Sequence, residues 1–103
     1  MRLSSKQMQF TSMIARLILH AEQLGYGLTF GDAFRPQNAK YGKKNSLHKK
    51  RLAVDFNLFK NGEYLTKTDD YLILGEYWES IGGSWGGRFN DGNHFSLEHE
   101  GVR

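Results

Sequence analysis

The sequence predicts a small α+β domain in which helices pack on one side of a small antiparallel sheet. Two observations support this fold class. Two segments carry apolar residues at helical spacing, and three shorter segments have the pattern of strands. Turns rich in glycine and asparagine separate them, and no repeat or low-complexity stretch divides the chain. Because the chain has 103 residues, we expect residues 1–103 to form a single domain with one modest core.

The first predicted element is an amphipathic helix over Ser5–Leu24. Its apolar residues recur at helical spacing and form one stripe: Phe10, Ile14, Leu17, Ile18, Ala21 and Leu24. Ser4 or Ser5 can cap the start of this helix, and Gly25 can end it. His20 lies beside the stripe, where we expect a surface or half-buried side chain.

The next elements are strands. Leu28–Phe34 is predicted as the first and ends before Pro36, because proline cannot continue a hydrogen-bonded ladder. Leu52–Phe59 is predicted as the second. Its apolar residues alternate with Ala53, Asp55 and Asn57, so the Asp55 side chain should project away from the buried face. Turn residues at 60–63 predict a hairpin into a short third strand.

The C-terminal part begins with a second helix, which Thr68 caps and Gly82 ends. Its buried stripe is Leu74, Tyr77, Trp78 and Ile81. We expect residues 85–93 to form a glycine-rich loop and His94–Glu98 to form the last strand, again by alternation. His99 and the tail after it should lie at the surface.

Composition narrows the classes of function. Apolar residues make up 39% of the chain and charged residues 24%, as in ordinary soluble domains. The chain has no cysteine, so any metal ion must be held by His, Asp or Glu. The net charge of +3 weakly favours an acidic partner. Six basic residues lie within 40–51, but no nucleic-acid-binding motif accompanies them, so nucleic acid stays a minor option.

The sequence predicts neither export nor membrane insertion. The segment Met1–Gln9 is polar, and charged residues interrupt the apolar residues after it. No stretch approaches the length of a membrane span. We therefore expect a protein that is made in the cytosol, does not associate stably with membranes and is a monomer.

Three side chains far apart in the chain form the ligand set of a catalytic zinc ion: His48, Asp55 and His94. Two imidazoles and one carboxylate leave a fourth tetrahedral position open for water, which distinguishes a catalytic zinc site from a structural one. Asp91, three residues before His94, could act as the general base for that water. Glu98 is the rival carboxylate. Taken singly, His48 could be a solvated loop residue and Asp55 the partner of a basic side chain.

These residues resemble the motifs of zinc D-alanyl-D-alanine and L-alanyl-D-glutamate peptidases, which cut peptidoglycan peptides. The first family motif is Ser-x-His-x-x-Gly-x-Ala-x-Asp, and the matching residues are Ser46, His48, Ala53 and Asp55. Arg51 replaces the glycine. The second motif is Glu or Asp, two residues, then His, and it matches Asp91 and His94. The resemblance runs from about residue 28 to residue 96.

The resemblance implies the fold of these peptidases, which the hedgehog signalling domain shares, and it implies roles for several residues. His48, Asp55 and His94 would hold Zn²⁺, which makes water nucleophilic near neutral pH. Asp91 would accept the proton of that water and deliver it to the leaving amine. The arginine that usually completes such a site corresponds to Arg35.

Three further residues have alternative interpretations. Arg35 would stabilise the oxyanion or clamp a substrate carboxylate, and its alternative is a salt bridge with Asp32. Ser46 would order the loop or support a ligand near the substrate, since no His-Asp relay is evident to make it a nucleophile. Trp85 would either form a wall of the substrate cleft or pack on the second helix.

An aspartate at the base position and the short single-domain build look most like bacteriophage endolysins with L-alanyl-D-glutamate peptidase activity. We therefore expect a zinc metallopeptidase that cuts the L-Ala–D-Glu bond of bacterial peptidoglycan for host lysis. It would remain in the host cytoplasm until the membrane opens and then act on the cell wall. The alternatives are a D-Ala-D-Ala carboxypeptidase, a non-catalytic module that binds zinc or the cell wall, and a basic nucleic-acid binder.

Overall fold

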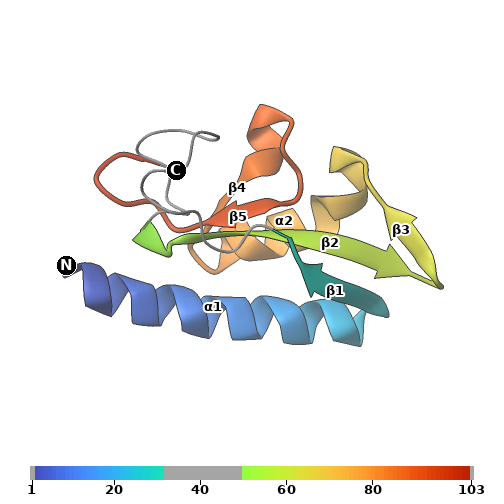
Figure 1. Cartoon of the computed structure of the whole chain (residues 1–103), viewed down its shortest axis with the longest axis horizontal. Helices are drawn as coiled ribbons and strands as arrows, with labels where there is room; N and C mark the ends of the chain where they lie inside the picture. The colour runs from blue at the N-terminus through green and yellow to red at the C-terminus, as the bar shows by residue number, and fades with distance from the viewer. Residues whose placement is uncertain (1, 32–49, 103) are drawn as a thin grey trace.

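Two helices and an antiparallel sheet make up the described part of the chain, which is residues 2–31 and 50–102 of a computed structural model (Figure 1). This is the α+β fold class that the sequence predicts. The elements in chain order are α1 (Leu3–Gln23), β1 (Tyr26–Phe30), β2 (Ala53–Lys60), β3 (Glu63–Leu65), the 3₁₀ helix η2 (Thr68–Tyr71), α2 (Leu72–Ser80), β4 (Ser84–Trp85), the 3₁₀ helix η3 (Gly86–Phe89) and β5 (His94–Ser96).

The long strand β2 organises the sheet. The strand order is β1-β2-β5-β4, and β3 pairs with the end of β2. All pairings are antiparallel. β1 lies along one edge of β2, from Tyr26 opposite Lys60 to Phe30 opposite Phe56. β3 and β5 share the other edge, where β5 pairs with the start of β2 and β3 pairs with its end.

Both helices cover the same face of the sheet. α1 runs lengthwise beneath β1 and β2 (Figure 1), and its buried residues are Phe10, Met13, Leu17 and Ala21. Trp78 of α2 meets Phe10 and Phe95 edge-on, with ring centroids 5.8 and 6.0 Å apart. Phe95 in turn lies 5.9 Å from Phe56 of β2. These aromatic contacts join α1, α2 and the sheet into one core, which buries the apolar face of β2.

The first helix differs from its prediction at both ends. It begins at Leu3, so Ser4 and Ser5 lie inside the helix, and neither is its cap. The helical residues end at Gln23, which leaves Leu24 off the buried stripe and 41% exposed. Gly25 follows with φ +87°, which confirms that it ends the helix.

The second helical segment opens differently from the prediction. Lys67 is the N-terminal cap of η2, and its backbone N–H donates to the Asp70 carboxylate at 3.0 Å. Thr68 is therefore not a cap, and its hydroxyl accepts a hydrogen bond from the backbone N–H of Gly92 at 3.3 Å. The predicted loop 85–93 was also wrong in part, because it contains η3 and the end of β4.

The C-terminal tail folds back on itself. His99 is only 9% exposed, so the prediction of a surface residue was wrong. The backbones of His99 and Val102 exchange two hydrogen bonds of 3.0 and 2.9 Å. Positive φ angles at Glu100 and Gly101 close the tight turn between them, as in two-residue hairpin turns.

None of the helices in the described ranges is long and apolar enough to span a membrane.

Gly75 of α2 provides a test of the core. A Cβ atom at this position would overlap the ring of Trp85, which is buried and hydrogen-bonded. Helix propensity alone favours alanine over glycine by about 1 kcal/mol. We nevertheless expect Gly75→Ala to lower the free energy of unfolding by about 1–3 kcal/mol, because overpacking outweighs propensity. Urea denaturation checks this, with Glu76→Ala on the exposed side of the same helix as the control; an increase in stability for Gly75→Ala would contradict the packing.

Candidate active site

Asp55 and His94 face each other across the junction of β2 and β5. Their Cα atoms are direct partners in the ladder. The adjacent backbone hydrogen bond runs from Phe56 N–H to Asn93 C=O at 2.9 Å. Asp55 and His94 therefore form a non-hydrogen-bonded pair, the type in which facing side chains approach most closely. The alternation predicted for β2 is thus what brings two of the expected ligands together.

The two side chains are close enough to share one ion. Nδ1 of His94 lies 3.2 Å from Oδ1 of Asp55. Two donors at the zinc distances of about 2.0–2.2 Å lie roughly 3.3–3.6 Å apart at a tetrahedral ion. The side chains are 16% and 18% exposed, so both are largely removed from water and both can still be reached. A carboxylate oxygen and an imidazole nitrogen are also ligands that zinc prefers, and the pair therefore fits the metal.

Small residues surround the pair. Ala53 and Ser96 are partners one rung along on the same face of the sheet. On the other edge of β2, the N–H of Gly31 donates to the carbonyl of Asp55 at 2.7 Å. A Cβ atom on Gly31 would lie 3.4 Å from the Cβ of Asp55. The side chains next to Asp55 and His94 on this face are therefore short, and both Ala53 and Ser96 are buried.

Three predicted site residues lie outside the described residues: Arg35, Ser46 and His48. Within 2–31 and 50–102, no three His, Cys, Asp or Glu side chains gather into a metal site. The described chain therefore contains two members of the predicted zinc triad, Asp55 and His94, and the role of His48 stays a prediction.

Asp91 begins the tight turn that leads into His94. Its carbonyl accepts the His94 N–H at 3.1 Å, and its own N–H donates to the Gly86 carbonyl at 2.9 Å. Asp91 lines a polar pocket of about 190 Å³, whose other residues are Tyr64, Thr66, Thr68, Tyr71, Asn90, Gly92 and Asn93. Glu98, the rival carboxylate, lines a different pocket together with Glu79 and Arg88. The two candidates therefore stand in separate surroundings.

Gly92 fixes the position of this turn. Its carbonyl accepts a hydrogen bond of 2.7 Å from the indole Nε1 of Trp85, and its N–H donates to the Thr68 hydroxyl at 3.3 Å. A Cβ atom on Gly92 would lie 2.7 Å from the Cα of Thr68, so only glycine allows this close approach. Trp85 and Thr68 thereby hold the backbone between Asp91 and His94 from two sides.

The polar pocket also contains a neutral hydroxyl donor. Tyr71 donates to the carbonyl of Phe56 at 3.1 Å, next to Asp55 in the chain. Burial raises the pKa of Tyr71, and the neighbouring Tyr64 raises it further. The hydroxyl therefore stays protonated at neutral pH and continues to anchor β2 beside the site.

The sequence model of the D-alanyl-D-alanine carboxypeptidase family matches residues 40–97, more than half of the chain. The chain belongs to this family. Its members act on peptidoglycan and are in general zinc-dependent. The matched range includes His48, Asp55, Asp91 and His94, and it does not include Arg35. A search of curated proteins finds no match to this chain.

Two interpretations were predicted for Trp85, a wall of the substrate cleft or packing on the second helix. In this peptidase the Trp85 ring packs against Gly75 of α2. It is 3% exposed and is the ladder partner of Phe95, so it lies on the helix-covered face. The face that carries Asp55 and His94 is the opposite one. The Arg88 guanidinium lies 5.1 Å from the Trp85 ring centroid and makes two hydrogen bonds to Glu79, at 2.7 and 3.0 Å. These bonds lower the pKa of Glu79 and raise that of Arg88, and they tie η3 to α2.

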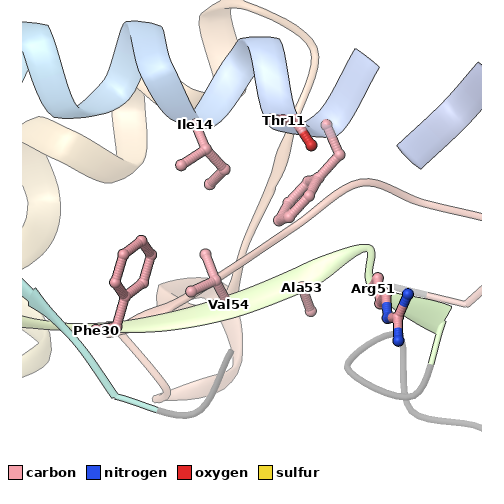
Figure 2. Close-up of a pocket in the computed structure, with 7 residues that line it drawn as sticks. Thr11, Ile14, Phe30, Arg51, Ala53 and Val54 are labelled. Carbon is pink, nitrogen blue, oxygen red and sulfur yellow. The ribbon is translucent and has the colours of Figure 1, made fainter. Parts of the chain in front are cut away.

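A second, apolar pocket does not include Asp55 or His94 in its lining. It has a volume of about 280 Å³ and lies between α1 and the sheet, where Ile14 faces Phe30 and Val54 (Figure 2). Val54 points to the face of β2 opposite to Asp55, because successive side chains of a strand alternate. The pocket therefore opens on the side of the sheet that the helices cover.

Sequence reasoning missed a row of polar side chains beside Asp55 and His94. Asn57 was predicted to share the face of Asp55, but no role was given to it. In the structure its amide donates to the Thr29 hydroxyl at 3.2 Å, and its carbonyl accepts from the Tyr64 hydroxyl at 3.3 Å. Alternation alone placed Asn57; its two partners depend on the pairing of three strands, which the sequence did not specify.

The indole of Trp85 can be tested as a positioning group. Trp85→Phe removes the donor to Gly92 and frees the turn that carries Asp91 and His94. We expect the free energy of unfolding to fall by about 1–3 kcal/mol and peptidoglycan hydrolysis to fall by roughly tenfold, as small displacements at reacting groups do.

The matched control is Trp78→Phe, which also removes a buried indole donor, here to the carbonyls of Ser84 and Ser96. Turbidity assays well below the unfolding transition compare the two variants. Equal loss of hydrolysis in both would show that Trp85 contributes to stability alone.

Proposed function

We propose that this peptidase is a zinc-dependent endopeptidase, of the endolysin type, that cuts the L-Ala–D-Glu bond in the peptide stem of peptidoglycan. The observation that carries the proposal is the lining of the pocket at Asp91, the proposed base beside Asp55 and His94. Among the residues that the structure describes, this pocket has neither Lys nor Arg in its lining. A carboxypeptidase must bind the free terminal carboxylate of its substrate, for which a cation is the usual partner. A pocket whose described lining lacks a cation instead suits the interior of a peptide, which has no terminal carboxylate.

The proposed ligands of the zinc ion are His48, Asp55 and His94. When bound, the ion supplies Lewis-acid polarisation and lowers the pKa of a water molecule. Asp55 and His94 are already held side by side by the ladder between β2 and β5. Little reorganisation is therefore needed at these two positions before the metal binds.

Asp91 is the proposed general base. It takes a proton from the attacking water as the oxygen of that water bonds to the scissile carbonyl carbon. It then gives this proton to the nitrogen as the C–N bond breaks, which leaves a carboxylate and a free amine. The turn anchored at Gly92 supports this role, because the side chain of aspartate is short and its reach depends on backbone placement. Glu98 lines a different pocket, together with Arg88 and Glu79. This separation favours Asp91 over Glu98 as the general base.

Two residues outside the described ranges complete the proposal. Arg35 would stabilise the oxyanion of the tetrahedral intermediate or bind a carboxylate of the stem, since its planar fork of donors suits both tasks. Ser46 would support the loop that carries His48. As an endolysin, the enzyme would stay in the host cytoplasm and reach the wall once the membrane had been opened.

A D-Ala-D-Ala carboxypeptidase is the second candidate. The description of the family favours it, and Arg35 could then bind the terminal carboxylate of the substrate. The two candidates differ in product: the carboxypeptidase releases free D-alanine, whereas the endopeptidase creates a new amino terminus on D-glutamate.

Product analysis and metal removal test the proposal together. Purified peptidoglycan is digested, and the new termini are mapped by mass spectrometry. We expect D-Glu amino termini, loss of activity with EDTA and recovery with Zn²⁺. Release of D-alanine without D-Glu termini would establish the second candidate, and full activity after complete metal removal would contradict the zinc mechanism.

The assignment of the base is tested by Asp91→Asn, with Glu98→Gln as the matched variant. Loss of a general base costs about 10²–10⁴-fold in rate, so we expect kcat to fall at least a hundredfold for Asp91→Asn while the zinc content is retained. Glu98→Gln should keep kcat within about threefold. The reverse pattern would assign the base to Glu98.

A further inference from the structure

Three polar side chains continue the site along β2, and we name them the amide row: Thr29 of β1, Asn57 of β2 and Tyr64 of β3. Asn57 donates to the Thr29 hydroxyl at 3.2 Å, and Tyr64 donates to the Asn57 carbonyl at 3.3 Å. Asn57 lies on the same face as Asp55, two residues further along the strand, so their Cα atoms are about 6.6–6.8 Å apart. The amide row therefore begins two residues from Asp55, one of the proposed zinc ligands.

The position of the amide row relative to Asp91 indicates which part of a substrate it meets. Tyr64 lines the same pocket as Asp91. In the proposed function, Asp91 delivers a proton to the leaving amine, so the leaving fragment must lie on the side of Asp91. An extended peptide rises about 3.3 Å per residue. Its second residue beyond the scissile bond therefore reaches the amide row.

The chemistry of the amide row fits peptide amides. Its three side chains carry both donors and acceptors and have no formal charge at neutral pH. The Asn57 amide has two N–H donors, and its carbonyl oxygen has two lone pairs. The hydrogen bonds to Thr29 and Tyr64 use one N–H and one lone pair. The second N–H and the second lone pair are the groups that would bind a ligand. The same contacts fix the plane of this amide before a ligand arrives, which lowers the entropy cost of binding. Tyr64 is also 53% exposed and stacks on Phe59 at 5.1 Å, so it offers a rigid surface.

We propose that the amide row binds the backbone amides of the leaving fragment and thereby selects substrates that extend at least two residues beyond the scissile bond. This inference rests on the proposed function and deepens it. The amide row would give preference to cleavage within the peptide stem over removal of a single terminal residue. Asn57 is then a residue that determines specificity, and it takes no part in the bond-breaking steps.

The test uses two synthetic stem peptides that share the same scissile bond and have leaving fragments of one and of three residues. For Asn57→Ala we expect kcat/KM on the longer peptide to fall about five- to tenfold, mainly through KM, as loss of neutral hydrogen bonds predicts. The loss on the shorter peptide should be at least threefold smaller. Tyr64→Phe and Thr29→Val, which keep the shape of the side chains, should show smaller losses in the same direction.

Gln9→Ala is the matched control, because it removes an exposed amide from α1, on the other side of the sheet. It should leave both substrates unaffected. Equal losses on the two peptides for Asn57→Ala, or no loss on either, would overturn the inference.

A further measurement separates this inference from the proposed function. If the wild-type protein cleaves neither peptide, the proposed function has failed. Calorimetric titration of the free three-residue leaving fragment then decides the inference alone. Weaker binding by Asn57→Ala than by the wild type and Gln9→Ala supports the amide row, and equal binding by all three proteins overturns it.

Discussion

The site depends on one rung of the sheet, the non-hydrogen-bonded pair of Asp55 and His94. A strand pair of this kind brings facing side chains closer than the hydrogen-bonded pairs next to it. A shift of one residue in register would turn one of the two side chains to the other face. The apolar residues that alternate with Asp55 along β2, together with Phe95 on β5, prevent this shift, because they must remain in the core. The same pattern that folds the domain thus sets the distance between these two side chains.

The rest of the structure restrains this rung from the helix side. Trp78 joins both helices to Phe95, the residue that follows His94. Trp85 packs against Gly75 of α2 and holds the carbonyl of Gly92, two residues before His94. Asp55 and His94 therefore lie on the face of the sheet opposite the aromatic core. Small residues, which include Gly31 and Ala53, are their neighbours on that face, whereas large aromatic residues fill the other.

The sequence predicted the fold class, and it predicted that Asp55 projects away from the buried face of β2, because both follow from alternation along strands. The family motifs supplied the association between Asp55 and His94, and the ladder explains it physically. Details that depend on tertiary contacts were not predictable in the same way. Thr68 has the side chain of a helix cap, yet its hydroxyl accepts from Gly92, far along the chain. Trp85 lies in a glycine-rich stretch typical of a loop, yet Gly75 gives it space in the core. His99 is buried although it directly precedes the tight turn at Glu100 and Gly101 near the C-terminus.

The central claim is that Asp55 and His94 bind the same zinc ion. A crystal structure of the zinc-loaded protein, with anomalous diffraction recorded at the zinc absorption edge, tests it most directly. The account predicts one strong anomalous peak at about 2.0–2.2 Å from a carboxylate oxygen of Asp55 and from a ring nitrogen of His94. A zinc ion bound elsewhere, with these two side chains paired only to each other, would contradict it.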